Sequence, residues 1–444
     1  MPPGALLNLL PFAAFLGIIA VLPLLPRVSG WWERDSSKLM LAVPAMLSGV
    51  TLHLWSTGDW AAVGHTSVEY LAFMALLTSL FVVTGGIHIS GSYAGFPRTN
   101  TLVLAIGAVS ANLLGTTGAS MLLIRPLLSA NRERRHKTHI VIFFIMVVAN
   151  CGGLLTPLGD PPLYLGFLRG VPFDWTLRLI PEWVLVISLL LGVFYGLDRW
   201  QFAREADETH GALRLQVERS ERRLHIRGKP NLLWLGGVMG TILVSGYLVR
   251  PGLVRTLGPE TADLGCKALQ ILFLFGIALF SYRTTDLHIH RANRFTFGPI
   301  REVALLFFGI FGAMLPALAA VAEAGKRLGV SEPWQYFWSS GSLSAFLDNA
   351  PTYLVFASLA AGQSGVSPSD LGMLAVSSPE LLAAVSTGSV FFGAMTYVGN
   401  GPNFMLKAIA EHAGIRMPSF GRYLVWSVAI LIPIFLLETW LFFW

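Results

Sequence analysis

Long apolar stretches separated by short polar ones occupy most of the chain. Because a helix needs about 20 apolar residues to cross a bilayer, each such stretch is a candidate membrane span. The pattern predicts spans at residues 5–25, 39–57, 67–88, 139–170, 183–198, 231–249, 266–282, 301–325, 380–412 and 421–443. We therefore predict an all-α polytopic membrane protein.

Two further apolar stretches carry polar residues at their centres. Residues 100–130 contain GTTG (Gly115–Gly118), and residues 334–362 contain DNAP (Asp348–Pro351). We predict that each is a re-entrant hairpin, with its polar tip at the bilayer centre and both ends on one face. The alternative is a pair of tilted spans joined by a short outside turn.

Lys and Arg positions decide between these alternatives. With hairpins, the predicted inside loops hold 23 Lys and Arg and the predicted outside loops hold 6, which is the bias that orients membrane proteins. The inside loops are 27–38, 89–99, 131–138, 198–230, 283–301 and 407–422, and the outside loops are 58–66, 169–182, 250–265, 326–333 and 363–379.

Helix breakers interrupt two of the predicted spans. Asn150–Leu163 reads NCGGLLTPLGDPPL, and Thr396–Asn403 reads TYVGNGPN. No unbroken helix tolerates so many Gly and Pro residues. Both segments share Thr, then Gly at +3, Asp or Asn at +4 and Pro at +6, at an offset of 240 residues. Two broken segments at matching positions indicate a transporter's midplane site, whereas two outside loops matching by chance would not need apolar flanks.

The two breaks divide the chain into related halves. We predict a first repeat at 1–198, with its hairpin at 100–130 and broken helix at 139–170, and a second at 231–444, with its hairpin at 334–362 and broken helix at 380–412. The repeats are inverted, because the first starts outside and the second inside. Residues 199–230 form a cytoplasmic linker. Both termini are predicted to be external.

Composition supports the membrane assignment. The chain of 444 residues is 54% hydrophobic and 13% charged, whereas soluble domains are about 25% charged. Its net charge of +6 resides in loops, so the expected partner is the lipid bilayer and not nucleic acid. The two cysteines show no metal or disulfide spacing. The first 27 residues lack a basic start and are predicted to be a first span, not a cleaved signal.

The hairpin tips and the breaks supply the candidate chemistry. Hydroxyl, carboxylate and carbonyl oxygens are hard ligands that suit small cations, and two acids favour a cation over an anion. The candidate ion- or proton-binding residues are Thr116, Thr117, Thr156, Asp160, Asp348, Asn349, Thr396 and Asn400, and the sodium candidates among them are Asp160, Thr156 and Asn400.

The two acids can each hold a proton or a metal cation, because burial disfavours the charged form of a carboxylate. Competition between the two occupants is a sufficient basis for exchange of Na⁺ against H⁺. Asp348 follows the apolar Ala345–Leu347 and is the candidate proton carrier. Alternatively, each acid is a helix N-cap, since the prolines that follow suit a first helical turn.

Four motifs resemble one known family. GTTGASMLLIRPLL, TPLGDPPLYLGFLRGVPF, FLDNAPTYL and GAMTYVGNGPNFM are similar to the NhaD-type sodium/proton antiporters of the ion transporter (citrate-transporter-like) superfamily. The resemblance implies inverted repeats, a scaffold that can dimerise, elevator-like movement and roles for Asp160, Thr156, Asp348, Asn349 and Asn400. Carboxylate carriers of that superfamily place Ser-Asn-Thr at the tips, where this chain has GTTG and DNAP.

The leading hypothesis is a non-enzymatic secondary transporter that exchanges Na⁺ or Li⁺ for H⁺ across the cell (inner) membrane by alternating access, with no cofactor. One alternative is an organic-anion (di- or tricarboxylate) or arsenite transporter of the same architecture, with Arg125 facing the substrate. Another is a channel or a pump subunit, although the chain has no Walker motif. An enzyme is disfavoured, because neither HExxH nor GxSxG occurs.

Overall fold

The computed structural model describes residues 3–22, 28–32, 34–90, 95–208, 225–325 and 330–444. The first half contains α1 (Pro3–Val21), α2 (Ser29–Trp32), α3 (Asp35–Thr57), α4 (Trp60–Gly85), β1 (His88–Ser90), α5 (Pro97–Ala130), α6 (Thr138–Val147), η2 (Cys151–Leu155), α7 (Pro161–Leu168), η3 (Phe173–Leu179) and α8 (Ile180–Glu208).

The second half repeats much of this order. It contains β2 (His225–Arg227), α10 (Pro230–Val244), η4 (Ser245–Val249), α11 (Arg250–Leu257), α12 (Pro259–Thr284), α13 (Leu287–Ala292), α14 (Gly298–Gly325), α15 (Pro333–Ser344), α16 (Asn349–Gln363), α17 (Leu371–Ser377), α18 (Pro379–Phe391), η5 (Phe392–Met395), α19 (Gly401–His412), α20 (Phe420–Glu438) and η6 (Thr439–Phe443). In each half, long helices precede a hairpin, a broken helix and a last long helix.

The helices are long and apolar enough to make this a multi-pass membrane protein. Within the described ranges, nine helices are long and apolar enough to cross a membrane, or ten when the bent pair Leu371–Ser377 and Pro379–Met395 counts as one span. This test uses length and composition alone, so the nine include α5, which folds back on itself as described below. Large apolar side chains such as Leu233 and Leu272 are 80% and 68% exposed on the outer helices, as a lipid-facing surface requires.

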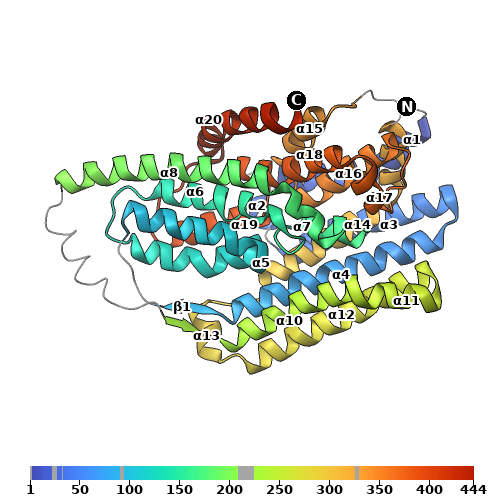
Figure 1. The fold of residues 1–444 in the computed structure, drawn as a ribbon, viewed down its shortest axis with the longest axis horizontal. Helices are drawn as coiled ribbons and strands as arrows, with labels where there is room; N and C mark the ends of the chain where they lie inside the picture. Colours follow the sequence, from blue (N-terminus) through green and yellow to red (C-terminus); the bar gives the residue numbers. More distant parts are fainter. Residues whose placement is uncertain (1–2, 23–27, 33, 91–94, 209–224, 326–329) are drawn as a thin grey trace.

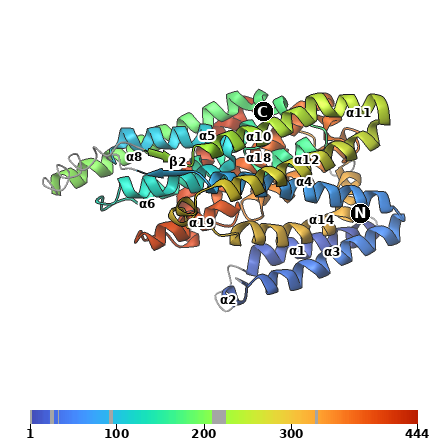
Figure 2. The same ribbon diagram turned by 90° about the horizontal axis from the view of Figure 1, so that it is seen from below.

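The helices form two bundles. In the first, which we call the outer bundle, α3 packs on α14 and α4 packs on α12, with α1 and α10 alongside. The second, the core bundle, holds both hairpins, both broken helices, α8 and α20. In Figure 1, α10 and α12 lie along the lower side and α8 and α20 along the upper side, and in Figure 2, α1, α3 and α14 form the lower side. The bundles meet where α14 contacts α16 and α4 contacts α5 and α7.

Both predicted hairpins fold back on themselves. In α5 the backbone leaves the helical region at Gly115, where φ is 74° and ψ is 154°, a left-handed φ that favours glycine. The side chains of Asn100 and Asn131, near the two ends of this segment, exchange hydrogen bonds of 3.0 and 2.8 Å. In the second hairpin, Tyr336 near the start of α15 donates to Gln363 at the end of α16, over 2.6 Å. Their position relative to the membrane stays a prediction.

The described parts of the predicted inside loops lie toward one end of the molecule. β1 pairs with β2 in antiparallel register, Ile89 opposite Ile226, and thereby joins loop 89–99 to the linker. Thr138 donates to the Arg416 carbonyl over 3.2 Å, and Arg301 pairs with Asp35 at 2.6 Å. In Figure 1, β1 and α13 lie at the lower left, and α11 and α17 lie in the right part of the molecule. Which end faces the cytoplasm stays a prediction.

Several predicted loops are wholly or partly helical. α4 begins at Trp60, within predicted loop 58–66, because Asp59 caps it by accepting from the Ala62 N–H at 3.0 Å. η4 and α11 continue α10 as far as Leu257, and α17 lies within predicted loop 363–379. α8 extends ten residues into the predicted linker, to Glu208, while residues 209–224 lie outside the described part of the chain. Polar residues therefore mark where an apolar span ends, whereas the helix itself can continue into the polar segment.

Candidate ion-binding site at the helix breaks

The two breaks have nearly the same backbone. Asp160 directly precedes α7 with φ −141° and ψ 144°, and Asn400 directly precedes α19 with φ −147° and ψ 140°. Thr156 and Thr396 end the preceding 3₁₀ turns in extended conformations. The shared Thr, Gly and Asp or Asn frame therefore encodes one local structure that occurs twice.

The matched threonines tie each break to the hairpin of its own half. Thr156 donates its hydroxyl to the Asn112 carbonyl on α5, and Thr396 donates to the Ala345 carbonyl at the end of α15. The backbone N–H of Thr116 also donates to the Gly159 carbonyl at 2.8 Å. These bonds engage both threonine hydroxyls. The hydroxyl of Thr156, a predicted sodium ligand, is therefore hydrogen-bonded to a backbone carbonyl.

Asp160 receives one side chain from each of the other three interrupted elements. Its Oδ1 accepts from the Thr116 hydroxyl of the first hairpin at 3.0 Å and from Asn400 Nδ2 of the second break at 3.4 Å. Its Oδ2 accepts from Asn349 Nδ2 of the second hairpin at 2.8 Å. All four side chains are at most 4% exposed. We call Asp160, Thr116, Asn349 and Asn400 the Asp160 cluster.

Two asparagines that the sequence analysis did not select support this cluster. Asn150 Oδ1 accepts from Asn400 Nδ2 at 3.2 Å, and Asn150 Nδ2 donates to Asn403 Oδ1 at 2.8 Å. Asn403 in turn donates to the carbonyls of Gly393 and Thr396. Both asparagines are fully buried and cross-link the two breaks. Their position inside the Gly- and Pro-rich segments was the available sequence signal.

Glycines let the elements approach one another at this site. A Cβ on Gly393 would lie 2.4 Å from Asn349 Oδ1 and 2.7 Å from Asn150 Oδ1, and one on Gly159 would lie 2.1 Å from the Gly153 carbonyl oxygen. A side chain at Gly393 would therefore displace Asn349 of the cluster, and one at Gly159 would push apart the backbone of the first break.

The other predicted residues lie outside the direct contacts of Asp160. Asp348 is half-buried and caps α16 by accepting from the Ala350 N–H at 3.1 Å. Thr117 is half-buried and is not among the donors to Asp160. Arg125 donates to the Asn293 carbonyl over 2.5 Å, which joins the first hairpin to the outer bundle. Asp160 stands at an N-cap position, but its side chain makes no capping bond.

The cluster is acidic and otherwise neutral. Its donors are one hydroxyl and two amides, and within the described ranges no Lys, Arg or His acts on the Asp160 carboxylate. A carboxylate removed from water without a cationic partner is unstable in its charged form. It becomes stable when it takes up a proton or when a cation binds beside it. The arrangement can therefore hold either species at one place.

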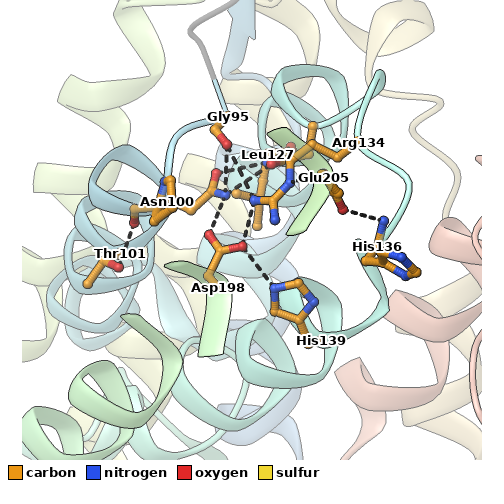
Figure 3. Close-up of polar contacts among 11 residues, drawn as sticks. Gly95, Asn100, Thr101, Leu127, Arg134, His136, His139, Asp198 and Glu205 are labelled. Carbon is orange, nitrogen blue, oxygen red and sulfur yellow. Dashed lines mark hydrogen bonds and ion pairs between the residues drawn. The ribbon is translucent and has the colours of Figure 1, made fainter. Parts of the chain in front are cut away.

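A second polar cluster lies at the end of the molecule that holds the predicted inside loops. Asp198 of α8 accepts from Asn100 at 3.0 Å and pairs with Arg134 at 2.5 Å and His139 at 2.9 Å (Figure 3). Arg134 also pairs with Glu205 at 3.2 Å. Here the two buried acids share a buried arginine, whose positive charge faces both of them. The cluster joins the ends of the first hairpin to α6 and α8, and the sequence analysis did not predict it.

A cavity of about 1300 Å³ lies between the bundles at the opposite end. Residues of four predicted outside loops, Arg169 among them, line it together with Glu69 and Lys267. Arg169, at the end of α7, pairs with Glu69 of α4 at 3.2 Å and so connects the core bundle to the outer bundle. No member of the Asp160 cluster lines this cavity.

Comparison with known proteins agrees with this architecture. A family model described as "Putative citrate transport" matches residues 4–443, nearly the whole chain. The chain belongs to this family. It is therefore a membrane transporter of the citrate-transporter-like type, as its many apolar helices also indicate. Its family and fold point to a transporter and not to an enzyme. No curated protein matches the chain.

Proposed function

We propose that this transporter exchanges Na⁺ or Li⁺ for H⁺, as the NhaD-type antiporters that it resembles do. One observation carries the proposal: the Asp160 carboxylate is 1% exposed and receives only neutral donors. A site built to bind an anion would not centre on a carboxylate, because like charges repel. A site that alternates between a proton and a small cation needs this group.

In the proposed cycle, Asp160 binds a proton from one side of the membrane and releases it when Na⁺ or Li⁺ arrives from the other side. In the cation-bound state, the hydroxyl oxygen of Thr116 and the amide oxygens of Asn349 and Asn400 can serve as ligands after a rotation of each side chain. Because a protonated carboxylate is neutral and attracts a cation weakly, binding of Na⁺ or Li⁺ favours release of the proton, and protonation favours release of the cation. No cofactor enters this cycle.

The proposal includes inverted repeats, with the core bundle moving against the outer bundle as an elevator in the cell (inner) membrane. The Glu69–Arg169 pair and the Arg125 bond to Asn293 would then separate in each cycle. Single cysteines at positions 133 and 370, in a background without Cys151 and Cys266, should be labelled by an impermeant reagent from opposite sides. Labelling of both from one side would contradict the inverted topology.

The experiment that tests the exchange uses the purified protein in liposomes with a pH-sensitive dye inside. We expect an inward Na⁺ or Li⁺ gradient to raise the lumenal pH, and K⁺ to have little effect. Radiolabelled citrate, succinate and arsenite should not accumulate. A matched preparation with Asp160→Asn controls for leak, because its helices are otherwise the same.

The second candidate function is transport of a di- or tricarboxylate such as citrate, and the description of the family favours it. The amides of Asn150, Asn349, Asn400 and Asn403 offer the donors that a carboxylate substrate needs. In that case a cation at Asp160 would neutralise the repulsion of the substrate. Uptake of citrate or succinate in the same liposomes, without a cation-driven pH change, would replace antiport with this function.

A further inference from the structure

A second buried acid lies in the core bundle, apart from the Asp160 cluster. Glu438, the last residue of α20, is 0% exposed, and neither of its carboxylate oxygens has a hydrogen-bond partner among the described residues. Glu182, near the start of α8, is 8% exposed, and its Oε2 also has no partner within the described part of the chain. The two acids are close enough for Glu182 to act electrostatically on Glu438.

The polar groups around Glu438 are engaged elsewhere. Thr439 donates its hydroxyl to the Phe435 carbonyl at 2.7 Å and accepts from Trp338 Nε1 at 3.0 Å. Trp183 Nε1, next to Glu182, donates to the Gly152 carbonyl at 3.0 Å. Phe435, which precedes Glu438 by three residues on α20, stacks its ring on that of Phe392. Among the described residues, the buried Glu438 therefore has no donor for a negative charge.

We propose that Glu438 is a second, proton-selective binding site, which holds a proton in this conformation and has Glu182 as its electrostatic partner. A charged carboxylate with no donor and an acid beside it is strongly disfavoured, and a single proton removes the charge. A small metal cation would need several oxygen ligands, and the nearby hydroxyl and carbonyl groups already bond one another. The proton needs only one carboxylate oxygen.

Within the described residues, charged or titratable groups on three elements act on Glu438 or on Glu182. Glu182 of α8 acts on it directly, Arg178 of η3 acts on Glu182, and the Cys151 side chain of η2 lies within electrostatic range of Glu438. Cys151 is also within range of Asp160. A change of charge at Glu438 would thus alter the electrostatic potential at Cys151, in the first break. The coupling of this second site to transport rests on the proposed antiport, whereas its occupation by a proton does not.

The test is infrared spectroscopy of the purified full-length protein at neutral pH in a detergent without ester groups, where protonated carboxylic acids give a carbonyl band separate from the amide bands. We expect a band component that is absent in Glu438→Gln and moves in frequency in Glu438→Asp, which keeps an acid on a shorter side chain. The component should persist in Glu182→Gln. Glu411→Gln is the matched control, because the Glu411 side chain is 45% exposed and pairs with Lys407 at 3.5 Å.

The outcomes separate the two proposals. A component that survives in Glu438→Gln, or that disappears in Glu182→Gln instead, would overturn the assignment of the proton to Glu438. If Glu438→Gln does not fold, an unchanged spectrum in Glu438→Asp would overturn it equally. Asp160→Asn should keep the component even though it abolishes antiport. Failure of wild-type protein to exchange cations for protons, with the component present, would overturn the proposed function alone.

Discussion

The two helix breaks have the same backbone and differ in charge. Asp160 and Asn400 occupy matching positions before α7 and α19, and Thr156 and Thr396 make matching bonds to the hairpins. Yet only the first break carries a carboxylate, and the Asn400 amide donates to it at 3.4 Å. Both repeats therefore supply the same backbone geometry, whereas only the first supplies an ionisable group.

The largest effect is expected for Asp160→Asn, which gives the two helix breaks the same residue at this position. We expect the variant to fold, because an amide fits the same neutral surroundings, and to lose Na⁺-dependent proton release completely. Isothermal titration of Na⁺ into protein in two buffers of different ionisation enthalpy measures that release directly. Buffer-dependent heat equal to that of the wild type would show that Asp160 is structural.

Asp348→Asn is the matched comparison for Asp160→Asn. Asp348 caps α16 through the Ala350 N–H, and asparagine caps a helix about as well as aspartate. We therefore expect this variant to retain Na⁺ binding. Its proton release tests the sequence-based assignment of Asp348 as proton carrier, since loss of buffer-dependent heat with binding retained would support that role.

A double substitution that exchanges Asp160 and Asn400 tests whether the two breaks are interchangeable. In Asp160→Asn combined with Asn400→Asp, the carboxylate moves to the other break, where the backbone is nearly the same and Asn150 also lies at 3.2 Å. We expect cation binding to return in part. Its affinity should be weaker than in the wild type, because Asn349 donates its hydrogen bond to the side chain at position 160 and not to the one at position 400. Titration of the double variant beside Asp160→Asn measures the recovery, and its complete absence would mean that the breaks are not interchangeable.

A smaller effect is expected at the tip of the first hairpin. Thr116→Val removes a hydroxyl 3.0 Å from Asp160 Oδ1, and a hydrogen bond to a charged group contributes about 1.5–3 kcal/mol. Na⁺ affinity should therefore fall roughly 10- to 100-fold. Thr117→Val, a change of the same size one residue along, should have a smaller effect. Equal losses in both variants would mean that the tip acts through its shape and not through the Thr116 hydroxyl.

The smallest effect concerns stability. Thr396→Val leaves the Ala345 carbonyl without its bond from the break, which should lower the free energy of unfolding by about 1–3 kcal/mol. Thr387→Val is the control, because its hydroxyl bonds carbonyls within its own helix that already accept backbone N–H groups. Thermal unfolding in detergent compares the two. A Thr387→Val variant as unstable as Thr396→Val would argue against the tie between break and hairpin.

The sequence alone determined the helical membrane architecture, the two fold-back segments and the two breaks. These features follow from local chemistry: apolar length sets a span, a dense run of Gly and Pro breaks a helix, and Gly115 allows the backbone conformation at which α5 folds back. The internal match between Thr156–Pro162 and Thr396–Pro402 likewise predicted two equivalent breaks, which the structure contains. Asp160 was selected in this way.

Only the tertiary structure decided which polar groups meet. Thr116 contacts Asp160 and Thr117 does not, because neighbouring residues on a helix point about 100° apart and packing alone sets which one faces inward. Asn150 joins Asn403, and Glu182 approaches Glu438, across long stretches of chain that no local pattern relates. The hydroxyls of Thr156 and Thr396, which look like cation ligands in the sequence, bond backbone carbonyls of the hairpins because the fold brings those carbonyls to them.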